Sequence, residues 1–164
     1  MSATAQSTFV YVTYIRTTPQ KLWDALTKPE FTKQYFFGVT MESDWKVGSP
    51  WQMVGETGTI TDAGEVLETD PPKRLVLKWR NEFMPELKAE GYTRCTFDIS
   101  EQSGIVELKV THEMDRDNAK TIAAVSGGWP KILSSLKSML ETGTPIAQKP
   151  GSPNADRASV RAAG

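Results

Sequence analysis

The middle of the chain, residues 39–113, alternates apolar and polar residues with a period of two, and this feature constrains the fold more than any other. Such alternation is typical of strands that bury one face. Because the connections between the alternating segments are too short for crossovers, neighbouring strands are expected to pair antiparallel. Short groups of Gly, Pro and Asp divide the region and predict strands near residues 39–44, 50–55, 59–69, 73–81, 91–101 and 104–113.

A strand and two short helices are expected before this meander. Residues 9–15, FVYVTYI, are aromatic and β-branched, which predicts a first strand. Thr18 and Pro19 then predict a helix start, because Thr caps helices and Pro suits the first helical position. Pro29 begins a second short helix, which Gly38 is placed to end.

The end of the chain predicts one long helix. Residues 118–126 are expected to form a loose helical lead-in, and the GGWP segment, residues 127–130, to break or start the main helix. From Trp129 to Leu140 apolar residues recur at helical spacing, so one stripe of the helix should lie on the sheet. Gly143 is placed to end this helix.

These elements predict one α+β domain of the helix-grip type, with a curved antiparallel sheet of about seven strands and a long C-terminal helix across it. A chain of 164 residues that is 38% hydrophobic can bury a sizeable core. The domain is expected to span residues 8–143, after a flexible N-terminus at 1–7. Residues 144–164 are rich in Pro, Ala, Ser and Gly, which predicts a disordered tail.

Charge and composition limit the classes of partner that the protein is expected to bind. The 19 basic and 20 acidic residues leave a net charge of -1 without a Lys/Arg cluster, which argues against nucleic acid. No apolar run is long enough for a membrane span, and the first residues do not resemble a secretory signal. Cys95 is the single cysteine and is expected to be a structural core thiol. The sequence therefore predicts a cytoplasmic protein, monomeric or homodimeric.

Strand parity and helical spacing identify side chains that should face the space between sheet and helix. A curved sheet and a straight helix can leave a pocket there for a hydrophobic small molecule, although the same side chains can equally fill a core at normal density. Both alternatives stay open. The candidate lining residues are Trp51, Met53, Trp79, Phe97, Leu108, Val110 and His112 from the sheet, Trp129, Leu133 and Leu136 from the helix, and Phe36 and Phe37 at one end.

His112 is the only histidine and the one candidate for proton transfer near neutral pH. No Ser or Cys nucleophile can be paired with it from the sequence, so a structural or ligand-orienting role is favoured and no catalytic residue is assigned. One His and one Cys are too few for a typical zinc site, and no phosphate-binding loop is present. We therefore expect neither a metal nor a cofactor, and a binding protein rather than an enzyme.

Four segments in this order resemble a known superfamily: TTPQKLWDALTKPEFTKQYF, GEVLETDPPKRLVLKW, VTHEM and SGGWPKILSSLKSMLETG. Together they are similar to the SRPBCC superfamily, which has the START-like helix-grip fold. More narrowly, they resemble the C-terminal domain of the activator of heat-shock protein 90 ATPase and its stand-alone bacterial relatives. The resemblance covers about residues 8–143 and implies the same fold as the residue patterns.

The resemblance implies three functions. Superfamily members bind hydrophobic molecules such as lipids, sterols or polyketides between sheet and helix, so this is the first expectation. The narrower resemblance implies a stress-response co-regulator of a heat-shock protein 90 family chaperone. These 164 residues leave no room for the N-terminal domain that supplies much of the stimulation in the eukaryotic activator. A cyclase- or hydrolase-type enzyme is the third possibility, because some superfamily members have become enzymes.

Overall fold

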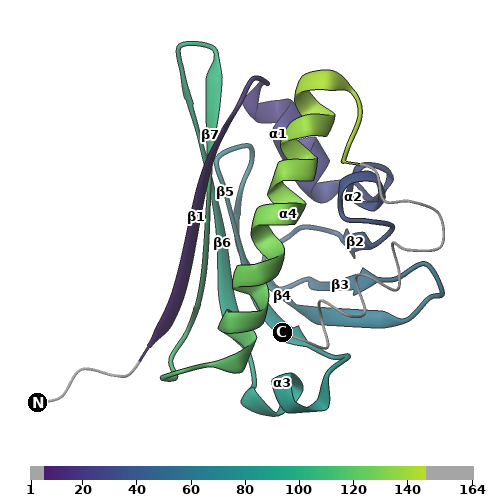
Figure 1. Ribbon diagram of the computed structural model, residues 1–164, viewed down its shortest axis with the longest axis vertical. Coiled ribbons are helices and arrows are strands. Elements are labelled where there is room, and N and C mark those ends of the chain that lie inside the picture. The colour runs from purple at the N-terminus through teal and green to yellow at the C-terminus, as the bar shows by residue number, and fades with distance from the viewer. Residues whose placement is uncertain (1–5, 147–164) are drawn as a thin grey trace, which may run out of the picture.

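The computed structural model describes residues 6–146 of the chain (Figure 1). The predicted flexible residues 1–5 and most of the predicted tail, residues 147–164, lie outside this range, so the predicted domain limits stay predictions. The elements in chain order are β1 (Ser7–Ile15), α1 (Pro19–Thr27), α2 (Pro29–Tyr35), β2 (Thr40–Ser43), β3 (Pro50–Val54), β4 (Ile60–Asp70), β5 (Arg74–Asn81), α3 (Pro85–Glu90), β6 (Thr93–Gln102), β7 (Ile105–Met114) and α4 (Lys120–Thr142).

The seven strands form one antiparallel sheet in the order β1-β7-β6-β5-β4-β3-β2, as the alternation predicted. Strands β2 to β7 form the meander, and β1 pairs with β7 from Ser7↔Met114 to Ile15↔Val106. Consequently β1 and β2 are the two edges of the sheet. In Figure 1 the strands at the two ends of the sheet run in clearly different directions, and α4 lies across the face between them.

Two register shifts in β4 contribute to this curvature. The pairing of β4 with β3 shifts between Asp62 and Ile60, and its pairing with β5 shifts between Val66 and Glu68. A bulged strand bends and twists more strongly than a regular one. The sheet is therefore bent at β4, between its central strands and the short strands β3 and β2.

The predicted inward faces are confirmed on the central strands. Every second residue of β5, of β7 and of β6 as far as Ile99 is buried, including Leu77, Cys95 and Leu108, none of which is exposed to solvent. Burial raises the pKa of the Cys95 thiol well above its usual value, so this cysteine is a core residue.

Helix α4 is one continuous helix of 23 residues, and the predicted break at residues 127–130 is wrong. Gly and Pro are costly inside a helix, and Pro130 cannot donate to the Ser126 carbonyl. Packing outweighs this cost, because Ile122 before the segment and Leu133 after it are both buried. As predicted, Gly143 ends the helix, with φ 85° and its N–H donating to the Met139 carbonyl at 2.9 Å.

Helix α3 was not predicted, and it supplies the N-terminal cap of α4. Ala119, the residue before α4, has no side chain that can cap the helix. Instead the Glu90 carboxylate accepts hydrogen bonds from the backbone N–H groups of Lys120 and Thr121, each at 2.8 Å. Burial raises the pKa of Glu90, but these hydrogen bonds outweigh it and lower the pKa overall. The short helix α3 thus fixes where the long helix begins.

No helix within residues 6–146 combines the length and apolar character needed to cross a membrane.

Candidate ligand site

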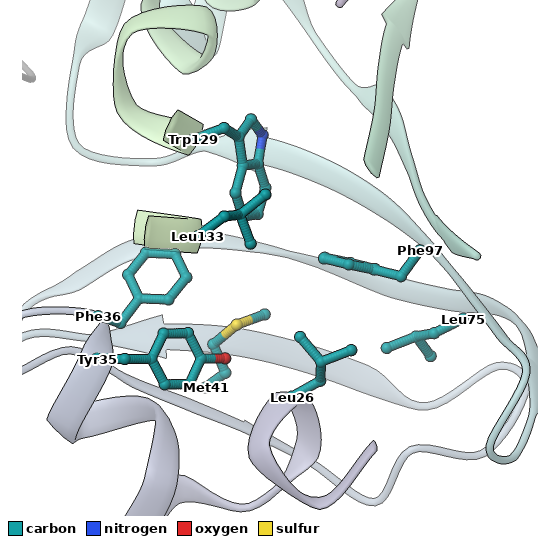
Figure 2. Close-up of a pocket in the computed structure, with 8 residues that line it drawn as sticks. All are labelled: Leu26, Tyr35, Phe36, Met41, Leu75, Phe97, Trp129 and Leu133. Carbon is teal, nitrogen blue, oxygen red and sulfur yellow. The ribbon is translucent and has the colours of Figure 1, made fainter. Parts of the chain in front are cut away.

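A small apolar pocket lies between the α1–α2 corner, α4 and the inner face of the sheet (Figure 2). The space left between its walls is about 10 Å³, roughly the room of one water molecule. This pocket is therefore far smaller than a lipid or a sterol. The lining residues are Leu26, Tyr35, Phe36, Met41, Leu75, Phe97, Trp129 and Leu133.

The predicted lining residues divide into three groups. Four of them line this pocket: Phe36, Phe97, Trp129 and Leu133. Phe37 is half-buried after the end of α2, with φ 54°, and is not among the lining residues. The other seven are buried in the surrounding core without lining the pocket: Trp51, Met53, Trp79, Leu108, Val110, His112 and Leu136.

Four lining residues were not predicted: Leu26, Tyr35, Met41 and Leu75. Leu26 and Tyr35 belong to the apolar faces of the two short helices, and Leu75 has the inward parity of its strand. The signal for burial was therefore present for these three. The sequence did not show that the short helices close the pocket from the side.

Trp129 is the centre of the aromatic packing around the pocket. Its ring lies edge-on to Trp79 and Phe97, each at 5.8 Å between centroids, and to Phe36 at 6.1 Å. Such edge-to-face contacts add to the stabilisation from burial alone. Because Trp129 lies on α4, Trp79 and Phe97 on the sheet and Phe36 after α2, this ring ties the three layers together.

His112 is held by hydrogen bonds at both ring nitrogens. Indole Nε1 of Trp129 donates to Nδ1 at 3.2 Å, and Thr93 Oγ1 lies 2.7 Å from Nε2. Since an indole N–H can only donate, Nδ1 is the acceptor and Nε2 carries the proton. The Thr93 hydroxyl accepts this proton in a hydrogen bond and donates its own to the Trp79 carbonyl at 3.0 Å.

This network makes His112 a neutral structural residue. It is fully buried, and burial lowers its pKa from 6.5 to about 3. The imidazole therefore stays uncharged at neutral pH, and both nitrogens are occupied by protein groups. The geometry does not support a role of His112 in proton transfer to a substrate. It supports a structural role, in which His112 fixes α4 to β6 and β7.

Two further indole groups of the core, those of Trp51 and Trp79, also donate to protein partners. Nε1 of Trp51 donates to the Lys78 carbonyl at 2.8 Å, and Nε1 of Trp79 donates to Asp62 Oδ2 at 3.2 Å. The first bond crosses β4 at Gly64, where an added Cβ would run into the Lys78 carbonyl oxygen. Glycine is therefore needed at this position for the tryptophan to reach across the strand.

The Tyr35 hydroxyl is different, because it makes no hydrogen bond with any of the described residues. Tyr35 is only 1% exposed, and burial alone raises its pKa far above the usual value. Figure 2 shows its oxygen directed into the space between the lining side chains. The other polar side-chain atom of the lining, Trp129 Nε1, already donates to His112. The pocket thus presents, on an otherwise apolar wall, one polar atom without a hydrogen bond to the described residues.

A sheet that grips one long helix, with two short helices at its end, is the helix-grip architecture that the sequence predicted. A family model described as "Activator of Hsp90 ATPase homolog 1-like protein" matches residues 16–141. The chain belongs to this family.

Solved structures agree on the fold. Protein MLL2253 from Mesorhizobium loti has a TM-score of 0.70 at 23% identity, over 82% of this chain and 96% of that one. The Aha1 dimer from Colwellia psychrerythraea has a TM-score of 0.67 at 20% identity, over 84% and 98%. PFC0360w, an HSP90 activator from Plasmodium falciparum, has a TM-score of 0.66 at 22% identity, over 81% and 95%. No curated protein matches the chain.

Proposed function

We propose that this protein binds a small, largely apolar molecule with one hydrogen-bonding group in the pocket under α4, without catalysing a reaction. The Tyr35 hydroxyl is the observation that carries this proposal. The Tyr35 side chain is buried, its hydroxyl faces the pocket, and no described residue forms a hydrogen bond with that hydroxyl.

A water molecule is a poor partner for this hydroxyl. A buried hydroxyl without a hydrogen bond costs about 1 to 3 kcal/mol. A buried water needs roughly two to four polar partners, and the lining offers Tyr35 alone because the Trp129 N–H is engaged. A ligand with an apolar surface and one polar group can contact the apolar lining and also form a hydrogen bond with the Tyr35 hydroxyl.

Binding requires the pocket to expand. Ligand sites for drug-sized molecules have volumes of roughly 300 Å³ or more, whereas this space is about 10 Å³. Met41 and Leu26 lie at the side formed by the short helices and β2, and methionine adapts its shape easily. Expansion costs packing energy, which favours a small ligand over a lipid or sterol of full length.

The test is native mass spectrometry of the freshly purified protein, followed by solvent extraction and identification of any bound molecule. We expect an adduct in the wild type that is lost or strongly reduced in Tyr35→Phe. Tyr14→Phe is the matched control, because Tyr14 is 54% exposed and bonds to Glu107 instead. An adduct that persists in Tyr35→Phe, or its absence after exposure to a panel of small apolar alcohols and ketones, would overturn the proposal.

Co-regulation of a heat-shock protein 90 family chaperone is the second candidate, and two observations favour it. The family model of Hsp90 ATPase activator-like proteins covers residues 16–141, and the pocket under α4 is small. In this case the outer surface of the domain would carry the function. The ATPase rate of the host's own chaperone, measured with and without the protein, decides it: an unchanged rate removes this candidate.

A further inference from the structure

Among the side chains of residues 6–146, the pocket under α4 offers a ligand a single free hydrogen-bond donor. The Tyr35 hydroxyl carries one proton, and burial raises its pKa far above the usual value, so this proton is retained at physiological pH. The Trp129 N–H is already engaged by His112. The other lining side chains are hydrocarbon, apart from the thioether of Met41, which is only a weak acceptor.

The backbone N–H groups around the pocket are engaged within the fold. The Met41 N–H donates to the Thr32 hydroxyl at 3.0 Å, and the Phe36 N–H donates to the Thr32 carbonyl at 2.8 Å. Leu75 and Phe97 are partners in the paired strands β5 and β6. The lining residues from the helices lie beyond the first turn, where N–H groups donate to carbonyls of the same helix. The backbone therefore adds no donor to that of Tyr35.

The lining also holds no charged side chain. Arg74 and Asp98 are the sequence neighbours of Leu75 and Phe97, but strand alternation places them on the outer face of the sheet, where they pair at 2.7 Å. No lysine or arginine of the described chain is buried. His112, behind the pocket, is uncharged at neutral pH because burial lowers its pKa to about 3. A ligand anion would therefore find no cation.

A charged ligand is excluded in both signs. A carboxylate in this pocket would have one hydrogen bond from Tyr35 and no counter-charge, and an unpaired charge in an apolar environment is far more costly than a neutral polar group. An ammonium group would need a carboxylate, but the buried Asp62 accepts from Trp79 Nε1 at 3.2 Å and is not among the lining residues. The ligand is therefore neutral.

Among neutral groups, the number of protons decides. An alcohol and the Tyr35 hydroxyl together bring two protons, but only one hydrogen bond can form between them, so one proton stays buried without an acceptor. A carboxylic acid or a primary amide leaves at least one proton unpaired for the same reason. A ketone or an ester brings no proton, and its carbonyl oxygen accepts the one that Tyr35 donates. With such a ligand no proton in the pocket lacks an acceptor.

Resting on the binding function proposed above, we infer that the ligand is a small neutral carbonyl compound, a ketone or an ester, whose oxygen accepts from the Tyr35 hydroxyl. Its hydrocarbon part lies among the rings of Phe36, Phe97 and Trp129, which surround the same space (Figure 2). The pocket thus selects its ligand by the absence of an acceptor and of a charge as much as by its apolar lining.

The experiment is an NMR titration of the isotope-labelled protein at pH 7 with methyl pentyl ketone, the secondary alcohol formed by its reduction, and hexanoate. The three compounds share one pentyl chain and differ at the polar end. We expect the wild type to bind the ketone, to bind the alcohol about tenfold more weakly because one proton stays unpaired, and to bind hexanoate at least about a hundredfold more weakly because its charge lacks a partner.

Two variants complete the test. Tyr35→Phe should fold, because it removes a buried hydroxyl that no described residue pairs with, and it should bind the ketone about tenfold more weakly than the wild type. Tyr14→Phe, at a site that is 54% exposed, should bind the ketone as the wild type does.

The outcomes separate the inference from the proposed function. If the alcohol or hexanoate binds the wild type as tightly as the ketone does, the inference is overturned while the proposed binding function stands. A wild type that binds none of the three compounds, or a Tyr35→Phe variant that binds the ketone as tightly as the wild type, would overturn both.

Discussion

Lowering the pH from 7 to 5 should destabilise the protein through His112 alone by about 2 kcal/mol. In the unfolded chain a histidine has a pKa near 6.5, whereas burial lowers that of folded His112 to about 3. Between these two values the unfolded state binds a proton that the folded state does not, so the free energy of unfolding falls as the pH falls. At pH values well below 6.5, each further unit lowers the free energy of unfolding by about 1.4 kcal/mol. Because this effect begins only near pH 6.5, the fall from pH 7 to pH 5 corresponds to about one and a half such units.

The assay is urea denaturation of wild type and His112→Gln at pH 7 and pH 5. Glutamine can accept from Trp129 and donate to Thr93, but it does not titrate. Glu82 and Glu90, whose pKa values are lowered in the folded state, contribute mainly below pH 4.5 and affect both proteins alike. We expect the wild type to lose about 2 kcal/mol more than the variant between the two pH values. Equal losses would refute the assignment of a buried, neutral His112.

Four further substitutions test the packing and the cap of α4. Trp129→Ala should lower the free energy of unfolding by about 3 to 5 kcal/mol, because it empties the centre of the aromatic packing; near-native urea stability would contradict the helix face assigned to α4. Glu90→Gln should lower the free energy of unfolding by about 1 kcal/mol at pH 7, because it weakens the cap of α4, and this difference from the wild type should shrink below pH 4.5. A difference that does not change with pH would argue against capping by the carboxylate. Gly64→Ala should lower the free energy of unfolding by about 3 kcal/mol, because the added methyl group meets the Lys78 carbonyl. Gly127→Ala in α4, where an added Cβ meets nothing, should raise the free energy of unfolding by about 1 kcal/mol. Thermal melts in which both variants shift the melting temperature in the same direction would contradict the roles assigned to the two glycines.

Much of the fold was accessible from the sequence, because period-two alternation reports directly on which side chains are buried. Trp79, Phe97 and His112 were placed inward by parity, and the structure buries all three. Helix α3 was missed because six residues are too few to show helical periodicity. The continuity of α4 was missed because local propensity at residues 127–130 opposes it, and packing partners distant in the sequence decide the outcome.

The site was less accessible, since the size of a pocket depends on how closely a helix approaches a sheet. That distance follows from the summed shapes of many side chains, which parity does not encode. Phe36, Phe97, Trp129 and Leu133 were predicted to line the pocket, whereas Tyr35 was not. Its unpaired hydroxyl could be recognised only once the partners of every neighbouring polar atom were known.

The composition of α4 has a consequence for how the protein opens. Its first half packs with Met114 and Ala119 through Ile122 in a small cluster, while its second half belongs to the main core through Trp129 and Leu133. Between them Gly127, Gly128 and Pro130 weaken the backbone connection. Local opening of the first half of α4 would therefore leave the packing of Trp129 and Leu133 on the sheet in place.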